Sequence, residues 1–211
     1  MPTTAPAAAT LRGRHVVLHP LAAGDVPGLF AALDDERVWA AGYNGGPAAR
    51  PVDVAGMQVV VDTGLAASRT GQRQQYVVRL ADDSELGAAG TVVGTSSLGE
   101  WDLGNERVHL GWTAYGPRWW ATVVNPECKL LMLGYAFDQC GFGRVKIQTD
   151  VRNVRSQAAI ARLGATREGV LRRHTRRADG TFRDTVVFSV VRDEWPAVRA
   201  ALLSRLPPPL D

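Results

Sequence analysis

The fold is decided by one stretch in the second half of the chain, Val145-Lys-Ile-Gln-Thr149-Asp-Val-Arg-Asn153-Val-Arg-Ser156-Gln-Ala-Ala-Ile-Ala-Arg-Leu-Gly164. Its first five residues predict a strand, and Asn153 is a favourable N-cap for the helix that follows. Gly164 stands just past the expected end of that helix, where glycine is common. The stretch therefore predicts a strand that feeds directly into a helix.

A second unit of the same kind lies upstream. Residues 107–113 (Arg-Val-His-Leu-Gly-Trp-Thr) alternate polar and apolar side chains, as a half-buried strand does. The next segment predicts a helix with Asn125 as N-cap, Pro126 at its first position and apolar residues at helical spacing to Phe137. The chain thus contains two successive strand-to-helix crossings.

The flanking sequence predicts the remaining elements. We expect strands at 15–20, 75–80 and 90–97, helices at 25–33 and 52–68, a loop over 34–50, and a hairpin of 169–176 with 185–191 around a turn at 178–181. The resulting order, β-α-α-β-β-β-α-β-α-β-β, indicates a mixed α/β domain.

Length and composition limit the classes of protein that the chain can represent. With 211 residues, 45% hydrophobic and 21% charged, the chain is typical of one globular domain. No apolar run approaches the ~18 residues of a membrane span, and the first ten residues lack the pattern of a secretory signal. We expect a disordered tail over 1–10, one domain over 11–205, a second tail over 206–211 and a cytoplasmic location.

The cysteines and histidines indicate neither a disulfide nor a metal site. Cys128 and Cys140 are the 2 cysteines, and on one helix they would stand about 18 Å apart. A disulfide needs Cα atoms within about 7 Å. The 4 histidines are scattered, so we also expect no metal.

Both predicted helix starts suit an anion. A helix N-terminus carries unpaired backbone N–H groups and the positive end of the helix dipole. At the first start, Thr122 would add a hydroxyl and Lys129 a mobile positive charge. At the second, Asn153 and Ser156 are polar, although such residues often serve only to cap their own helix.

Several spaced motifs together resemble the GNAT acyltransferase superfamily, and within it the branch of ribosomal-protein alanine acetyltransferases of the RimJ/RimL type. They are Arg107-Val-His-Leu-Gly-Trp, Val-Val-Asn125-Pro-Glu-Cys-Lys129, Asn153-Val-Arg-Ser156 with the helix to Gly164, and Arg-Glu168-Gly-Val-Leu-Arg. The opening run from Leu11 to Leu21, followed by Asp25, also fits. The resemblance covers residues from about 11 to 195 and depends on the order of motifs that are individually weak.

The resemblance implies a mixed central sheet of about seven strands with flanking helices, in which two central parallel strands splay into a V. Acetyl-CoA, or another acyl-CoA, would lie in that V as co-substrate. The strand that ends in Trp112 and Thr113 would face the pantetheine arm, and Asn153 and Ser156 would face the pantetheine and the sulfur. The pyrophosphate would lie on a loop formed by Trp120, Thr122, Val123, Val124 and Asn125, with Lys129 nearby.

The chain departs from the family pattern at the phosphate loop and at the acid–base positions. Val123 and Asn125 stand where small residues are usual, and a β-branched side chain hinders close approach of phosphate. Ile160 replaces a tyrosine that often protonates the leaving thiolate, which leaves Ser156 as candidate acid. His109 replaces a common glutamate and is the first candidate base, against a purely structural strand histidine. Glu106 is the second.

These features predict an acyl-CoA-dependent N-acyltransferase, most simply one that transfers acetyl to a primary amine on a protein N-terminus or a small molecule. Residues 34–74 would shape the acceptor pocket. Transfer of a larger or acidic acyl group such as succinyl is the alternative within the enzymes, and a non-catalytic acyl-CoA-binding module is the alternative outside them. A homodimer stays open.

A basic hairpin, Arg172-Arg-His-Thr-Arg-Arg177 with Arg183 across the turn, distinguishes these hypotheses further. Arg172 or Arg173 facing the acyl pocket would favour an acidic acyl chain. Nucleic-acid binding would also use this hairpin, but a net charge of +3 argues against it. The simplest interpretation is a solvated edge whose charges discourage aggregation.

Overall fold

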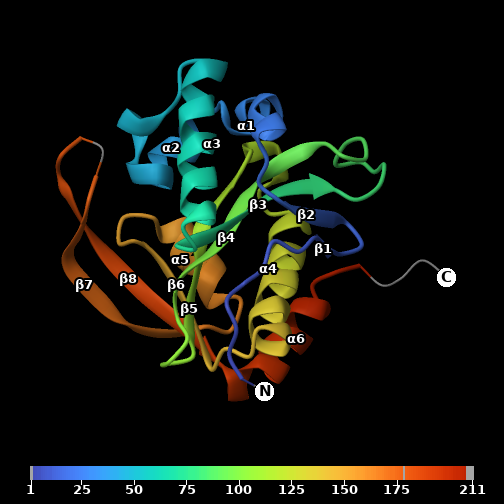
Figure 1. Ribbon diagram of the computed structural model, residues 1–211, viewed down its shortest axis with the longest axis vertical. Helices are drawn as coiled ribbons and strands as arrows, with labels where there is room; N and C mark the ends of the chain where they lie inside the picture. Colours follow the sequence, from blue (N-terminus) through green and yellow to red (C-terminus); the bar gives the residue numbers. More distant parts are fainter. Residues whose placement is uncertain (1, 178, 208–211) are drawn as a thin grey trace.

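A computed structural model describes residues 2–177 and 179–207 of the chain. Its centre is one eight-stranded sheet in the order β1-β2-β3-β4-β5-β6-β8-β7, with helices on both faces (Figure 1). The strands are β1 (Leu11–Arg12), β2 (Val16–Pro20), β3 (Arg73–Leu80), β4 (Val92–Asp102), β5 (Arg107–Tyr115), β6 (Arg144–Asp150), β7 (Thr166–Arg176) and β8 (Phe182–Val191). The helices are α1 (Val26–Leu33), α2 (Glu36–Ala40), α3 (Val54–Arg69), α4 (Val124–Gly134), α5 (Val154–Ala161) and α6 (Trp195–Leu203).

The two central strands diverge. Neighbouring strands of the sheet are antiparallel except β5 and β6, which are parallel. Their register covers only three positions, from Arg107↔Arg144 to His109↔Lys146, although β5 continues to Tyr115 and β6 to Asp150. The predicted mixed sheet with a V-shaped splay is confirmed. The strand count is eight rather than about seven, because the two-residue β1 pairs with β2.

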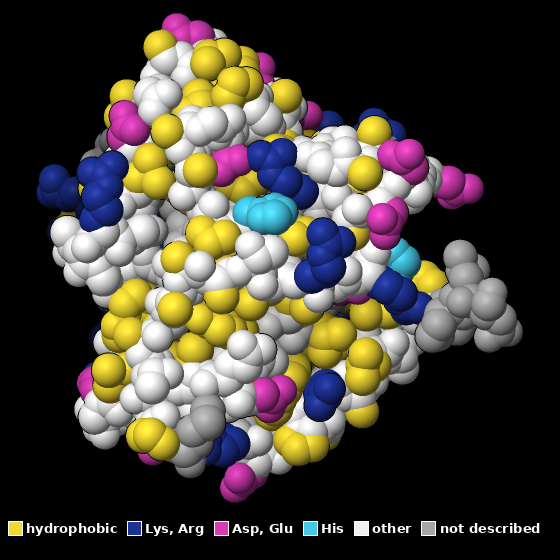
Figure 2. Space-filling model, turned by 45° about the vertical axis from the view of Figure 1, so that its right-hand side comes forward, with side chains coloured by type: hydrophobic (Ala, Val, Ile, Leu, Met, Phe, Trp, Pro, Cys, Tyr) yellow, Lys and Arg dark blue, Asp and Glu magenta, His cyan; other side chains and the backbone are white. Residues whose placement is uncertain are grey.

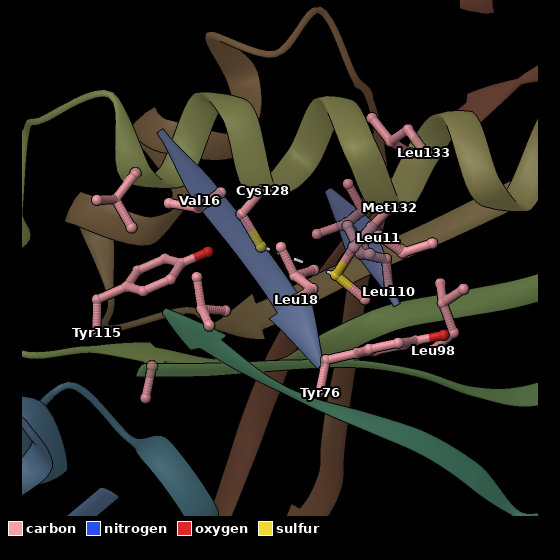
Figure 3. Close-up of a cluster of buried hydrophobic side chains, with 14 of the residues drawn as sticks. Leu11, Val16, Leu18, Tyr76, Leu98, Leu110, Tyr115, Cys128, Met132 and Leu133 are labelled. Carbon is pink, nitrogen blue, oxygen red and sulfur yellow. Dashed lines mark hydrogen bonds between the residues drawn. The ribbon is translucent and has the colours of Figure 1, made fainter. Parts of the chain in front are cut away.

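The helices form two layers around the sheet. α1 and α3 contact each other and the strands β4 and β3, whereas α4 contacts α6, β1 and β2 on the opposite face (Figure 1). Beneath α4, the side chains of Cys128 and Met132 point toward Leu110 and Leu18, and all four are fully buried (Figure 3). Burying each such aliphatic side chain contributes about 1.5–3 kcal/mol, so this layer holds α4 firmly on the sheet.

Helix α4 begins earlier than the sequence predicts. Its first residue is Val124, so Asn125 lies inside the first turn and its expected role as N-cap is wrong. The Thr122 hydroxyl accepts the N–H of Val124 at 3.3 Å, and Val124 is fully buried, which fixes the earlier start. The helix continues as a π-helical turn over Tyr135–Gln139.

Two further helices were not predicted. α2 lies inside the expected loop over 34–50, and the Asp35 side chain caps it by accepting the N–H of Arg37 at 2.9 Å. α6 packs against α4 through Trp195 and Val198, which are both buried. The predicted helix over 52–68 is confirmed as α3. None of the described helices combines the length and apolar character that a bilayer crossing requires.

The first residues of the chain pack on the domain instead of forming the expected disordered tail. Thr4 donates its N–H to the carbonyl of Cys140 at 2.9 Å, and Ala7 donates to the Tyr135 hydroxyl at 2.9 Å. This expectation is therefore wrong for residues 2–10, because their backbone finds partners on the protein surface. Met1 and residues 208–211 lie outside the described residues. Cys128 and Cys140 are free buried thiols, as expected.

The face that Figure 2 presents carries basic and acidic side chains interspersed with apolar ones. On this face the described residues form no continuous basic patch, so it offers no surface of the kind that a nucleic-acid backbone needs.

Candidate active site

Three segments meet where β5 and β6 diverge. Residues 116–123 lead from β5 into α4, and residues 151–153 lead from β6 into α5. The loop after α2 joins them, because the Asn153 side chain donates to the carbonyl of Ala41 at 2.6 Å. A Cβ atom on Gly42 would lie 4.0 Å from the Cβ of Asp150. The open end of the splay is thus bordered by the starts of α4 and α5 and by the residue 41–46 loop.

The expected phosphate loop is held by its own side chains. Thr122 donates its hydroxyl to the carbonyl of Trp119 at 2.8 Å, and the Trp120 indole donates to the carbonyl of Tyr115 at 2.7 Å. Val123 has a φ of −66°, which any residue adopts, and Ala121 is the residue with a positive φ here, at 59°. The backbone shape therefore does not require glycine at position 123.

Trp120 is also the point where the two helix starts touch. The guanidinium of Arg155, in the first turn of α5, lies 3.4 Å from the centroid of the Trp120 ring. Arg37 of α2 lies over the same ring at 5.8 Å. Stacked arginines on an aromatic ring retain free N–H donors, so this stack adds positive charge beside the start of α4.

Lys129 does not supply the expected mobile charge. Its side chain is buried, and its ammonium donates to Thr113 Oγ1 at 2.8 Å and lies 3.4 Å from Ser96 Oγ. Burial lowers the pKa of this amine, because no carboxylate accompanies it there to compensate for the lost water. The placement of Lys129 at the mouth of the helix is therefore wrong. Thr113 is likewise occupied beneath α4.

Asn153 and Ser156 occupy the start of α5 as the sequence predicts. The Asn153 carbonyl oxygen accepts the N–H of Ser156 at 2.9 Å, which confirms Asn153 as the N-cap. Since its amide nitrogen binds Ala41, both ends of the Asn153 side chain hold structure in place. Ser156 is half-buried, and Ile160 is buried in the core one turn further on.

His109 lies at the position where β5 and β6 begin to separate. Its side chain is 5% exposed, and its Nδ1 lies 3.4 Å from Glu100 Oε2. The imidazole packs on Trp112, with ring centroids 4.7 Å apart. A Cβ on Gly111 would lie 2.5 Å from His109 Nε2, so this nitrogen faces the β5 backbone just beyond the last paired position.

The environment keeps His109 neutral. Burial lowers its pKa below 6.5, and this effect outweighs the opposing effect of Glu100. The nearby positive charges of Lys146 and Arg183 lower it further. Hydrogen bonding from His109, followed by that from Lys146 at 2.7 Å, lowers the pKa of Glu100 to about 2. A neutral imidazole is the form that can accept a proton.

Glu106 lies at the wrong end of β5 for a catalytic base. It precedes the paired positions, whereas the strands diverge after them. Its side chain is exposed and lies beside Gly143 and Arg192, which is 3.9 Å away. Among the expected site residues, the structure therefore separates Glu106 from the others.

Trp112 owes its place to a bulge in β5. The register passes from Ser97↔Gly111 to Thr95↔Ala114, and Trp112 has a φ of 48°. Its ring covers Gly99, where a Cβ would lie 2.9 Å from the indole. The Arg73 guanidinium lies over the other part of this ring, 4.9 Å from its centroid. The bulge thus brings Trp112 between His109 and Arg73.

The basic hairpin divides into exposed and half-buried arginines. Arg172 and Arg173 are exposed, and Arg173 lies 4.1 Å from the Phe182 ring centroid. They therefore do not support an acidic acyl chain in the expected way. Arg177 instead forms a buried ion pair with Asp150 at 2.6 Å, which ties the hairpin to the end of β6. Among the described residues, no three His, Cys, Asp or Glu side chains gather as a metal site.

Comparison with known proteins agrees with this geometry. The family model described as an acetyltransferase (GNAT) domain matches residues 15–166, and the chain belongs to this family. A curated relative from Bacillus subtilis (strain 168), "Putative ribosomal N-acetyltransferase YdaF", is 28% identical over 123 residues. That match covers 58% of this chain and 66% of the relative, which is just under two thirds of the relative's length.

Solved structures match over greater lengths. An acetyltransferase from T. thermophilus is 32% identical, covers 96% of this chain and 99% of that chain, and has a TM-score of 0.82. A GCN5-related N-acetyltransferase from Brucella melitensis is 28% identical with 98% and 89% coverage and a TM-score of 0.85. RimJ of Mycobacterium smegmatis in complex with CoA-disulfide shares the fold at 18% identity, with 93% and 92% coverage and a TM-score of 0.73.

Proposed function

We propose that the protein is an acetyl-CoA-dependent N-acetyltransferase that acts on a primary amine. The observation that carries this proposal is the divergence of β5 from β6 after His109 and Lys146, with two helix starts at its open end. Acetyl-CoA supplies an activated thioester when it is bound there. Because a curated relative is named as a ribosomal N-acetyltransferase, a protein N-terminus in the cytoplasm is the first acceptor to test.

The residues at the splay fit this co-substrate. Trp120, Thr122, Val123, Val124 and Asn125 form the start of α4, where backbone N–H groups and the helix dipole favour a pyrophosphate. The ordinary φ of Val123 and the stacked guanidinium of Arg155 compensate for the missing glycines. Beyond Leu110, β5 leaves backbone groups free to align the pantetheine arm, and Ser156 lies at the start of α5.

The reaction requires a deprotonated amine beside the thioester carbonyl. Positioning alone can supply about 7–11 kcal/mol of the barrier, so few side chains need to act directly. The amine nitrogen forms a bond to the carbonyl carbon, and the carbon–sulfur bond breaks. His109 Nε2 accepts the proton that the amine loses, through a water molecule because the ring is buried, and Ser156 donates a proton to the leaving thiolate.

Two measurements on one sample test the proposal. Acetyl-CoA at about 100 times its Kd should stabilise the fold by about 2.7 kcal/mol and raise the Tm by roughly 5–11 °C. Release of free thiol should then depend on both acetyl-CoA and an amine-terminated peptide. Binding without thiol release across a panel of amines would instead indicate a non-catalytic module. The absence of any shift at millimolar acetyl-CoA would contradict the proposal.

A further inference from the structure

One face of the sheet collects charged side chains beside His109. In β3, Gln75 contacts α3 at Gly64, so Arg73, two residues earlier, points to the same side. Arg73 pairs with Gly99, Gly99 with His109, and His109 with Lys146, so their side chains share this face. We call it the acceptor face.

β8 contributes a second arginine to the acceptor face. Ser189 pairs with Lys146, and Arg183 lies an even number of residues along the same strand. Its Nε donates to Thr185 Oγ1 at 3.1 Å, which directs the guanidinium along the sheet. Its charge reaches His109, since it contributes to the lowered pKa of that imidazole. The hairpin therefore carries Arg183 back toward the reacting centre.

The carboxylates on this face are already used by other cations. Glu100 binds Lys146 at 2.7 Å, and Asp150 binds Arg177 at 2.6 Å. With His109 neutral, two positive charges on this face remain without a carboxylate partner within ion-pair distance among the described residues. They belong to Arg73 and Arg183.

Both remaining arginines are partly withdrawn from water. Arg73 stacks on Trp112, and its Nε is buried without a hydrogen-bond partner among the described residues. Burial also lowers the pKa of Arg73 and is the main cause of the lowered pKa of Arg183. Unpaired, half-buried cations are costly to a fold unless a ligand pairs with them. A guanidinium fork matches the two oxygens of a carboxylate.

We propose that Arg73 and Arg183 form a carboxylate-binding site beside the transferred group, so that the preferred substrate is acidic. The inference rests on the proposed transferase function and names its substrate class. The carboxylate has two sources, the amine acceptor or the distal end of the acyl chain. Both place a negative charge next to Trp112 and His109, on the face where the excess positive charge lies.

Matched substrate pairs separate the two sources. The first arm compares acetyl transfer to peptide amines that differ by glutamate against glutamine at the second residue. The second arm compares succinyl-CoA with acetyl-CoA on the glutamine peptide. We expect the carboxylate member of one pair to have a kcat/KM at least tenfold higher. Charge-assisted hydrogen bonds of this kind are worth about ten- to hundredfold.

Variants assign the preference to the two arginines. Arg73→Gln and Arg183→Gln should each reduce the preference about tenfold or more, with Arg73→Lys and Arg183→Lys retaining part of it. Arg172→Gln is the matched control, because Arg172 is exposed on β7 and outside the acceptor face. Thermal unfolding checks that each variant folds. Calorimetric binding of the same ligands provides the readout for any variant that turns over too slowly.

The outcomes distinguish the two proposals. Turnover of the glutamine peptide with acetyl-CoA, without a carboxylate preference in either arm, would overturn the carboxylate site and leave the transferase intact. A preference that survives both glutamine variants would overturn it as well. Absence of thiol release from every combination would contradict the transferase function, and equal calorimetric binding of the paired ligands would then overturn the carboxylate site independently.

Discussion

Glu127 holds the start of the domain from inside α4. Its side chain is 3% exposed and accepts the backbone N–H groups of Arg14 at 2.8 Å, His15 at 2.6 Å and Val16 at 2.8 Å. A carboxylate supplies four lone-pair sites for such donors, whereas an amide offers half as many and adds two donors of its own. The turn between β1 and β2 is therefore fixed by one residue that is distant in sequence.

We expect Glu127→Gln to lower the free energy of unfolding by about 2–4 kcal/mol, because hydrogen bonds to a charged group are lost and buried N–H groups stay unpaired. Urea denaturation of the variant and of the control Glu85→Gln, at an exposed loop position, measures the difference. Equal stability of both variants would show that the turn does not depend on this carboxylate.

His109 makes the stability of the fold depend on pH. Its pKa in the folded protein lies below the ordinary 6.5, because burial disfavours the imidazolium. The unfolded chain therefore binds this proton at higher pH than the folded one. The resulting stability is fully present above about pH 6.5 and is lost as the pH falls below that value. Glu100, with a pKa of about 2, adds a second loss only below about pH 4.5.

The test compares the free energy of unfolding at pH 7.5 and pH 5.5 for wild type, His109→Gln and the control His19→Gln. We expect the loss at pH 5.5 to be smaller in His109→Gln, since glutamine does not titrate, and unchanged in His19→Gln. The same loss in all three proteins would mean that His109 is not held neutral by its surroundings.

At the scale of elements, α5 is joined to the phosphate loop by a single stack. Arg155 lies 3.4 Å from the Trp120 ring centroid and retains N–H donors that can bind phosphate oxygens. We expect Arg155→Gln to raise the Kd for acetyl-CoA by about five- to thirtyfold, which corresponds to about 1–2 kcal/mol. Calorimetry measures this effect, with Arg162→Gln near the end of the same helix as control. A Kd within twofold of wild type would exclude Arg155 from the site.

The sequence predicts elements whose signals are local. Asn153 and Gly164 bound α5 correctly, and the alternation of 107–113 identifies β5. The start of α4 is missed because the cap is the Thr122 hydroxyl, two residues before the helix, while Asn125 is the stronger local signal. α2 is missed because a five-residue helix is hidden in a Gly- and Pro-rich segment.

The site depends on contacts that no local pattern contains. Glu100, His109 and Lys146 meet only because β4, β5 and β6 pair in a particular register. Lys129 has the spacing of a phosphate ligand but faces the sheet, which depends on where α4 begins. Strand periodicity does place Arg73 and Arg183 on a face, yet only the pairing of the strands reveals that they share it.

At the scale of the whole molecule, the β7–β8 hairpin is anchored to the sheet by the pair of Asp150 and Arg177, whose side chains are 9% and 12% exposed. Breaking a buried pair leaves an uncompensated charge, so we expect Asp150→Asn to cost about 3–5 kcal/mol. Urea denaturation measures this cost against the exposed control Asp82→Asn. A loss below 1 kcal/mol would mean that the hairpin holds its position without this pair.

The most direct test of the acetyl-CoA site is amide hydrogen exchange with and without acetyl-CoA, because it locates the ligand on the chain. We predict new protection in residues 110–113, 120–125 and 153–156, the segments that border the divergence of β5 from β6. Unchanged exchange in all three segments, or protection confined to other parts of the chain, would contradict the assignment of this site.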